Sequence, residues 1–435
     1  MNHDLGLVAL AVVSACVLLW GLVSARLERW DVSAPIAFVA LGVLVTHGPT
    51  GFVHFTLHSS AIRSMAEVTL AIVLFADACR VNLRALRLDA AIPARLLGVG
   101  LPLTIAAGFA VSAALFHAAG LWVAAAVGAI VAPTDAALGA SIMQDERVPA
   151  NVRRVLNVES GLNDGIATPF VNVFIAGAVT AEAVHGTHLT SAVIELVGGA
   201  ALGIGIGVAG GLLLGWSRRR GWSAAGVRPL AILALALFAY ATAVTAGTNG
   251  FVAAFVAGIA FGTIDHHHDR EALHFTEQTG TLLSLLVWFV FGAIMLVPGL
   301  EDLDWRDVVF AVLALTVVRM VPVAIALLGS GLDRTTVAFI GWFGPRGLAS
   351  IVFGLIAVDA LASSPSRVTL AAVTLTVTLS VLLHGITATP LAARYGALAT
   401  RLQRGRPEHR EAAPPIPTRA VRAMRPSPGP PGSSA

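Results

Sequence analysis

Long apolar stretches recur from one end of the chain to the other, separated by short segments rich in Arg, Asp, Gly and Pro. Each stretch is near the twenty residues that a helix needs to cross a bilayer, because an α-helix rises about 1.5 Å per residue. The pattern therefore predicts an all-α polytopic membrane protein with about thirteen transmembrane helices. The predicted spans are 5–24, 33–47, 61–79, 94–116, 119–143, 151–178, 189–215, 227–246, 249–264, 275–297, 307–329, 335–358 and 366–393.

The placement of arginine tests this topology. If the N-terminus lies outside, fifteen arginines fall in or beside the inner loops, and three, Arg63, Arg306 and Arg367, fall in the outer ones. Such an excess of positive charge marks the cytoplasmic side of membrane proteins. We expect a multi-pass protein of the cell membrane with its N-terminus outside and its C-terminus in the cytoplasm.

The overall composition agrees with a membrane domain followed by a different tail. The chain is 56% hydrophobic and 12% charged, about half the charged fraction of a soluble domain. We predict a membrane domain over residues 1–399 and a disordered basic tail over 400–435, because the tail is rich in Arg, Pro, Ser and Gly and has few large apolar residues. The arginines follow the topology rather than a recognition fold, so no nucleic-acid partner is predicted. No motif indicates a cofactor.

Five charged side chains fall near bilayer mid-depth. Charged groups are costly in hydrocarbon and usually mark ion or proton paths. Three are carboxylates and two are guanidinium groups, so the set carries one uncompensated negative charge. One monovalent cation or one proton would neutralise it, and both together would overcharge it, which is the minimum requirement for one-for-one exchange. The five residues are Asp135, Glu159, Asp164, Arg319 and Arg346.

Two spans contain helix-breaking residues next to these charges. In span five, Pro133 removes a backbone donor and clashes with the preceding turn, and Thr134 and Asp135 follow it. In span twelve the residues at 341–347 read GWFGPRG. Paired interrupted helices in corresponding positions of two halves are typical of a transporter site between inverted repeats. The alternative, a pair of structural proline kinks, does not explain the adjacent charges. The residues predicted to break span twelve are Gly344, Pro345 and Gly347.

Span six carries an oxygen-rich cluster two to three turns inside the helix. Residues four apart share a helix face, so Ser160 lies one turn from Asp164, and Glu159 lies one turn from Asn163. Carboxylate, amide and hydroxyl oxygens suit a hard cation such as Na⁺ or Li⁺. We interpret Asp164 as the exchanging carboxylate and expect Glu159 to pair with Arg319. Arg346 is expected to offset Asp135 or the helix ends exposed at the crossing.

Three motifs resemble those of the monovalent cation:proton antiporter-1 family, with NhaP-type Na⁺/H⁺ antiporters as the best description. They are PTD at 133–135, ESGLNDG at 159–165 and GWFGPRG at 341–347, in this order on spans five, six and twelve. The resemblance implies an inverted-repeat antiporter fold with two crossed interrupted helices, a homodimer and elevator-like transport without an enzymatic step. It implies core helices at about 94–178 and 307–393, and dimerisation helices at about 5–79 and 189–297.

The resemblance also implies roles for single residues. Asn163 before Asp164 matches the electroneutral branch of the family, and Glu159 matches the glutamate that pairs with the arginine of span eleven. The segment after Asp135, Ala-Ala-Leu, departs from the Pro-Val-Ala of many relatives. The residues that match family Na⁺-site positions are Thr134, Ser160 and Asp164.

Several alternatives stay open on sequence alone. In some relatives an acidic residue of span three lines the approach to the site, and either Glu67 or Asp77 could do so here. The residues do not separate Na⁺/H⁺ from K⁺/H⁺ exchange, and a cation channel or an intramembrane aspartyl dyad is less consistent with the flanking Thr, Ser, Asn and Arg. The histidine run 266–268 is interpreted as a solvated loop rather than a pH sensor or metal site. His384 is interpreted as a packed or hydrogen-bonded histidine.

Overall fold

Helices form all the regular structure that the computed structural model describes. It describes residues 2–30, 32–47, 59–80, 91–182, 188–264, 270–301, 303–401 and 407–409, and within these ranges there is no β-strand. The all-α fold predicted from the sequence is therefore confirmed.

The helices of the first half begin and end as follows. They are α1 (Asn2–Glu28), α2 (Ala34–His47), α3 (Ser60–Cys79), α5 (Ala91–Arg95), the π-helix η1 (Leu96–Gly100), α6 (Leu101–Leu115), the 3-10 helix η2 (His117–Ala119), α7 (Leu121–Ile130), α8 (Ala140–Gln144), α9 (Ala150–Glu182) and α10 (His188–Arg219).

The second half contains a matching series of helices. They are the 3-10 helix η3 (Ala225–Val227), α11 (Arg228–Thr245), α12 (Gly250–Ile264), α13 (Arg270–Val290), the π-helix η4 (Phe291–Leu296), α14 (Val297–Leu300), α15 (Trp305–Leu315), α16 (Val317–Ala326), α17 (Arg334–Trp342), α18 (Leu348–Ala360), α19 (Ser363–Ala399) and the 3-10 helix η5 (Pro407–His409).

Every predicted span overlaps one of these helices or a run of consecutive ones. Within the described residues, eight helical runs are long and apolar enough to cross a membrane, and α2, α7, α12 and α18 are shorter apolar helices. The number of thirteen crossings stays a prediction. One predicted boundary lies where the sequence placed it: α11 ends at Thr245 and α12 begins at Gly250, and Gly247 between them has a φ of 69°, a conformation that favours glycine.

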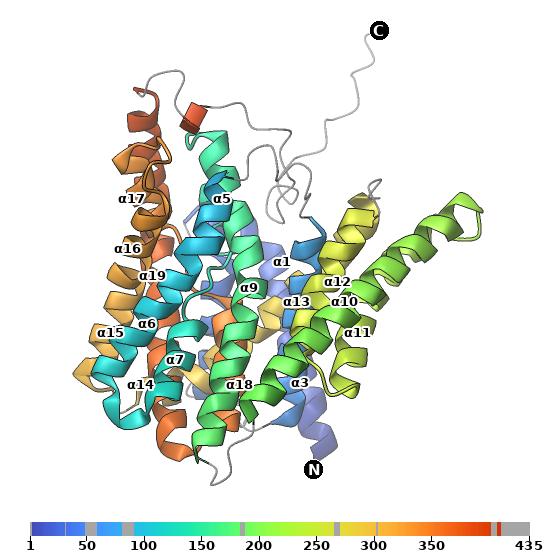
Figure 1. The fold of residues 1–435 in the computed structure, drawn as a ribbon, viewed down its shortest axis with the longest axis horizontal. Coiled ribbons are helices and arrows are strands. Elements are labelled where there is room, and N and C mark those ends of the chain that lie inside the picture. Colours follow the sequence, from blue (N-terminus) through green and yellow to red (C-terminus); the bar gives the residue numbers. More distant parts are fainter. Residues whose placement is uncertain are drawn as a thin grey trace.

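The helices pack as two groups with α9 and α18 between them in Figure 1. On one side α10 packs along α12, and α12 and α13 both contact α3. On the other side α6 packs on α7, α15 on α19, and α16 on α17. Small residues let the helices approach closely, since a Cβ at Gly203 or Gly207 of α10 would overlap the backbone of α12. Whether the groups act as separate core and dimerisation domains stays a prediction.

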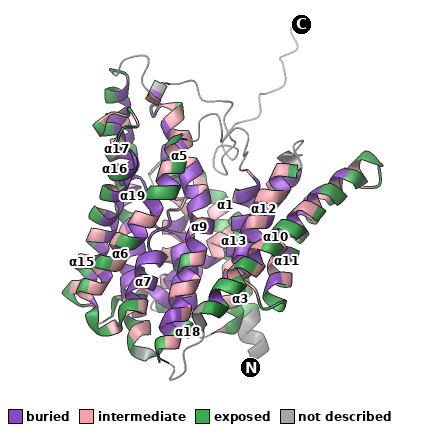
Figure 2. Cartoon of the chain, viewed as in Figure 1, coloured by how far each residue is buried: buried purple, intermediate pink, exposed green. Residues whose placement is uncertain are grey.

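The burial pattern fits a bundle surrounded by lipid. Large apolar side chains point outward on the long peripheral helices, for example Leu18 of α1, Ile194 of α10 and Phe238 of α11. Figure 2 shows exposed positions running along α10 and α11, whereas α18 is almost entirely buried. A helix that is apolar and buried all round belongs in the centre of a membrane bundle, and α18 is the helix that follows the second predicted break.

Candidate functional site

Two interrupted helices meet at the centre of the bundle. The first, α7, ends at Ile130, and residues 131–139 are not helical before α8 begins at Ala140. The second, α17, ends at Trp342, and α18 begins at Leu348. The two non-helical segments contact each other directly, because the backbone N–H of Asp135 donates to the carbonyl of Pro345 at 2.7 Å. The predicted pair of crossed, interrupted helices is confirmed.

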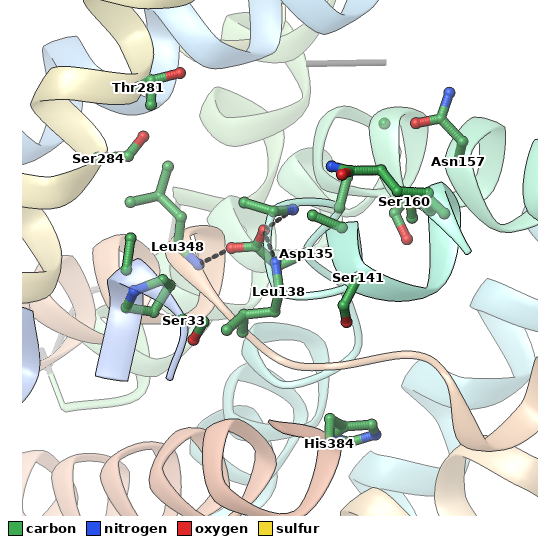
Figure 3. Close-up of a pocket in the computed structure, with 18 of the residues that line it drawn as sticks. Ser33, Asp135, Leu138, Ser141, Asn157, Ser160, Thr281, Ser284, Leu348 and His384 are labelled. Atoms are coloured by element: carbon green, nitrogen blue, oxygen red, sulfur yellow. Dashed lines mark hydrogen bonds between the residues drawn. The ribbon is translucent and has the colours of Figure 1, made fainter. Parts of the chain in front are cut away.

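Asp135 caps helix ends at this crossing. Its Oδ2 accepts the backbone N–H of Leu348, the first residue of α18, at 2.8 Å. Its Oδ1 accepts the N–H of Ala137 at 2.7 Å. Figure 3 shows this carboxylate between the two segments. A carboxylate is favourable at a helix N-terminus, where N–H groups lack intrahelical partners. Both carboxylate oxygens of Asp135 are thus bonded to the main chain. Asp135 is one of six residues that the sequence predicts to bind the cation or proton, with Asn163, Ser160, Thr134, Glu159 and the exchanging Asp164.

Arg346 donates hydrogen bonds to backbone carbonyl groups at the crossing. Its side chain is fully buried and donates Nη1 to the carbonyl of Ala132 at 2.8 Å and Nη2 to that of Ala314 at 3.3 Å. Ala132 lies just before Pro133, where the break of α7 leaves carbonyls without intrahelical partners. Of the two partners considered for Arg346, the structure gives it the helix ends and not the Asp135 carboxylate.

Glu159 and Arg319 lie together in the interior. Arg319 Nη1 of α16 donates to Glu159 Oε1 of α9 at 2.6 Å, and both side chains are 3% exposed or less. Removing two charges from water is costly, so such a pair persists only while both partners are present. The structure brings these two residues together across 160 positions of the sequence.

The remaining oxygen groups of the predicted cluster gather beside the first break. Asn163 Nδ2 donates to Thr134 Oγ1 at 2.6 Å, and Thr134 Oγ1 lies 3.1 Å from Ser160 Oγ. Asp164, one residue further along α9, has a buried Oδ1 that no hydrogen bond reaches within the described part of the chain. Buried polar atoms are normally satisfied. Asp164 Oδ1 and Asn163 Oδ1, which is also buried without a partner among the described residues, are therefore candidate ligands for a cation, and the Asp164 carboxylate can also take a proton.

A cavity of about 690 Å³ leads to Asp164. Asp135, Ser160 and Asp164 line its inner part, and Ser141, Thr281 and other polar side chains line its walls (Figure 3). The cavity is far larger than a bare monovalent ion, so it can hold a hydrated one. The lining residues at the ends of α1, α3 and α9 mark where it reaches the surface of the bundle. These are Glu28, Arg80, Asp145, Arg147 and Arg154.

The lining of the cavity shows which acidic residue of α3 lies near the site. Asp77 lines the cavity, whereas Glu67 is absent from its walls. Glu67 instead accepts hydrogen bonds from Arg63 Nε at 2.8 Å and from the hydroxyl of Tyr240 at 2.9 Å. The sequence could not separate the two, because both fall on the same span. The structure places Asp77 on the approach to Asp164.

At the cavity mouth, Asp145 lies in the loop between α8 and α9. Arg147 donates to its carboxylate from Nε at 2.9 Å and from Nη2 at 2.6 Å. These hydrogen bonds lower the pKa of Asp145 below its ordinary value. The carboxylate therefore stays ionised at neutral pH, and the mouth carries a charged pair rather than a titrating group.

Of the histidines singled out in the sequence, the structure describes His384 but not the run 266–268. His384 is buried, and its Nε2 lies 2.8 Å from the carbonyl of Trp342 at the end of α17. Its Nδ1 lies 2.8 Å from the carbonyl of Ser380. His384 is thus the hydrogen-bonded histidine that the sequence predicted. The run 266–268 lies outside the described residues. Among the residues that are described, no cluster of His, Cys, Asp and Glu could hold a metal ion.

Two contacts at the crossing had no signal in the sequence. The hydroxyl of Ser380 accepts the backbone N–H of Arg346 at 2.7 Å, and the hydroxyl of Ser350 donates to the carbonyl of Ile130 at 2.7 Å. Serines in apolar helices usually bond to their own helix, so only the three-dimensional arrangement identifies these two as supports of the break.

The crossing leaves no space for a side chain at Gly347, because a Cβ there would overlap the Asp135 carboxylate. We expect Gly347→Ala to reduce the transport rate about tenfold or more, since overpacking costs about 1–3 kcal/mol and here displaces the cap of α18. Gly341→Ala is the matched control, because its Cβ would lie 3.4 Å from Met320, an ordinary contact. Transport rates in proteoliposomes compare the two. Equal rates for both variants would contradict this reading of the crossing.

The comparison with known families decides where this chain belongs. A family described as "Sodium/hydrogen exchanger, transmembrane" matches residues 12–394. The chain is a member of the sodium/hydrogen exchanger family. The resemblance based on the three motifs is therefore confirmed, and the chain is placed among transporters.

Individual relatives of this chain carry two kinds of name. A probable Na⁺/H⁺ antiporter of Schizosaccharomyces pombe is 30% identical over 248 residues, covering 53% of this chain and 32% of that protein. The K⁺/H⁺ antiporter NhaP2 of Shewanella sp. strain MR-4 is 26% identical over 351 residues, covering 79% of this chain and 59% of that protein. The chain thus matches less than two thirds of the length of these relatives.

The fold agrees with a solved antiporter. The structure of the sodium proton antiporter MjNhaP1 from Methanocaldococcus jannaschii at pH 8 superposes with a TM-score of 0.72, covering 90% of this chain and 99% of that chain. At 18% sequence identity this likeness shows the fold alone. It confirms the predicted NhaP-type antiporter fold.

Proposed function

We propose that this protein is a secondary transporter that exchanges a monovalent cation for H⁺, with Na⁺ as the main substrate and Li⁺ as a second one. Asp164 is the exchanging carboxylate, which binds either the cation or a proton. Thr134 and Ser160 contribute further oxygens, and Asn163 holds the Thr134 hydroxyl in place. The protein would act in the bilayer as a homodimer and contribute to pH homeostasis.

One observation carries the proposal: Asp164 lines a large cavity and has a buried oxygen without a hydrogen-bond partner among the described residues. Each of the other mid-depth charged side chains has at least one partner among the described residues, although Glu159 Oε2 also has none. Glu159 pairs with Arg319, Asp135 bonds to backbone N–H groups, and Arg346 bonds to carbonyls. The single negative charge left by the charge count therefore falls on Asp164. A site that takes one cation or one proton supports electroneutral exchange.

Alternating access requires that the site open to one side at a time, and the geometry supports this. The cavity leads from Asp164 to the end of the bundle that holds Arg80 and Arg154. At the opposite end, Arg63 of α3 forms ion pairs with Glu67 and with Asp359 at the end of α18. We propose that these ion pairs help to close that end, and that an elevator-like movement of α18 with the other core helices opens it.

Weakening the ion pairs of Arg63 is expected to favour the state in which this end of the bundle is open. Asp359→Asn removes one ionic partner of Arg63, and a partly exposed ion pair is worth about 0.2–1 kcal/mol. The apparent affinity for a cation offered at the closed end should rise by up to about fivefold. Cation-dependent proton flux in oriented vesicles measures this affinity. Glu301→Gln, at an exposed position, is the control. An unchanged affinity in Asp359→Asn would refute the role of this pair.

K⁺/H⁺ exchange is the second candidate, because a relative that aligns with 79% of this chain is named a K⁺/H⁺ antiporter. Small changes in the number or spacing of oxygen ligands alter size selectivity, so the site supports either ion. Proteoliposomes with a preset proton gradient and a pH-sensitive dye separate the two, when Na⁺, Li⁺ and K⁺ are added in turn. Collapse of the gradient by Na⁺ and Li⁺ supports the main proposal, and collapse by K⁺ alone supports the second.

A further inference from the structure

A short segment after the last long helix docks on the membrane bundle. Residues 407–409 form the helix η5 and lie within the part of the chain predicted to be a disordered tail. Glu408 is only 1% exposed. Acidic side chains are almost never fully buried unless they are paired, so the partners of Glu408 identify what the segment does.

The partners lie at the ends of two helices that meet at the same end of the bundle. Glu408 Oε1 accepts the backbone N–H of Asp333 at 2.7 Å and the hydroxyl of Thr336 at 3.0 Å, both at the start of α17. The carbonyl of Pro407 accepts Asn151 Nδ2, from the start of α9, at 2.7 Å. The segment thus binds the first turns of α9 and α17 together.

The contacts of Glu408 complete an N-terminal cap that α17 cannot form alone. In a capping box, the N-cap side chain accepts an N–H of the first turn, and the third helical residue accepts the N–H of the N-cap residue. In α15 both acceptors are local, because Asp307 accepts the N–H of Asp304 at 2.9 Å. In α17 the third residue is Thr336, whose short side chain cannot perform this task. Glu408 supplies the second acceptor from 75 residues away.

A chain of hydroxyl groups extends this contact to α19. Thr336 has one hydroxyl proton and donates it to Glu408 Oε1, so in its second bond, at 3.1 Å, the donor is the hydroxyl of Tyr395. The ring of Tyr395 also stacks on Phe339 of α17, with centroids 4.1 Å apart. Glu408 therefore ends a polar and aromatic contact that joins α17 to α19.

We propose that Pro407–His409 is an intramolecular docking segment, and that its Glu408 fixes the inner end of α17 and thereby the geometry of the cation site. The segment occupies a site for an acidic peptide between α9, α17 and α19. α17 has nine residues and is about 13 Å long, and its other end leads directly into the crossing at Gly344–Pro345. A loosened first turn would change the position of the crossing, where Asp135 and Arg346 hold the helix ends.

The location of the partners determines which kinetic parameter changes. All of them lie on α9, α17 and α19, which belong to the predicted core, so the segment moves with the core and does not tie it to α3 or α13. Losing the segment should therefore raise the KM for the cation more than it lowers the maximal rate. This part of the proposal rests on the proposed exchange function.

Two truncations test the proposal in the full membrane protein. A chain that ends at residue 409 keeps the docking segment, and a chain that ends at residue 401 lacks it. We expect the first to retain the KM and thermal midpoint of the full chain. We expect the second to show a KM raised about fivefold, the change that loss of a typical helix cap produces in a local equilibrium, with a lower thermal midpoint. Identical behaviour of both truncations would overturn the proposal.

Point variants and a peptide keep the test valid if a truncated chain fails to fold. Glu408→Ala should raise the KM and lower the thermal midpoint as the truncation at residue 401 does. Glu408→Gln keeps a carbonyl acceptor, so it should keep most of the KM and thermal midpoint of the full chain. The double variant Thr336→Val with Glu408→Ala should change the KM and the thermal midpoint little more than either single variant does. A synthetic peptide of residues 402–412 should bind the chain that ends at 401 and restore its thermal midpoint, and the same peptide with Glu408→Ala should not.

These readouts separate the docking segment from the transport function. The thermal midpoint and peptide binding need no transport, so they hold even if the exchange assay fails. Peptide binding with an unchanged KM would overturn the proposed influence on the cation site. Absence of binding by the peptide, together with an unaltered thermal midpoint in Glu408→Ala, would overturn the docking site itself.

Discussion

Asp164→Asn is expected to abolish cation/proton exchange while leaving the protein folded. Asparagine has almost the same shape as aspartate, but it neither titrates nor carries the charge that a monovalent cation neutralises. The affected oxygen accepts no hydrogen bond within the described residues, so the substitution breaks no structural contact of that atom. Uptake of labelled Na⁺ into proteoliposomes driven by a proton gradient measures the effect. We expect uptake at the level of protein-free vesicles.

Asp145→Asn is the matched control for charge within the same cavity. Asp145 also lines the cavity, but it lies at the mouth and is already bound by Arg147. We expect this variant to keep most of the exchange activity. Substantial uptake by Asp164→Asn at a normal expression level would show that another group carries the proton, and Asp77 would then be the first residue to test.

Arg319→Met is expected to cause the largest loss of stability of any single substitution at the site. It leaves Glu159 charged, buried and without its partner in a region of low dielectric. Removing one member of a buried ion pair typically costs about 3–5 kcal/mol. We expect a clear fall in the thermal midpoint of the purified protein in detergent, measured by intrinsic fluorescence.

The double variant Glu159→Met with Arg319→Met tests the reason for this loss. Replacing both partners by apolar side chains of similar volume removes the uncompensated charge, and such replacements are often neutral for stability. We therefore expect the double variant to recover most of the thermal midpoint lost in the single variant. A double variant as unstable as Arg319→Met alone would mean that the guanidinium stabilises the site in some other way.

The spans and the two breaks could be predicted because they depend on local properties of the sequence. Apolar length identifies a helix that can cross a bilayer, and the turn at Gly247 separates α11 from α12 where it was expected. Pro133 and Pro345 mark the breaks because proline removes a backbone donor wherever it occurs. The depth of the five charges followed in the same way, from their positions within the predicted spans.

Partners could not be predicted, because a sequence contains no distances. Asp135 and Asp164 looked alike as mid-depth carboxylates, yet the first bonds to backbone N–H groups and the second has an oxygen without a partner. Glu67 and Asp77 were equal candidates on one span until the cavity separated them. Glu408 had no signal at all, because its acceptor role depends on Asp333, the N-cap residue of α17, which lies 75 residues earlier in the sequence.

The crossing also weighs against an aspartyl dyad. Such a dyad needs two carboxylates that share a proton. Both oxygens of Asp135 already accept N–H groups of the main chain, from Ala137 and from Leu348. Asp135 is thus bonded to the main chain through both oxygens, which does not match a carboxylate that shares a proton.

The most direct test of one-for-one exchange at Asp164 is a simultaneous recording of internal pH and membrane potential in proteoliposomes when Na⁺ is added outside. Electroneutral exchange predicts a change in internal pH without a change in potential, and no response in Asp164→Asn. A change in potential without a change in pH would indicate a channel and would contradict the account. A change in both would contradict the charge count that assigns one cation or one proton to Asp164.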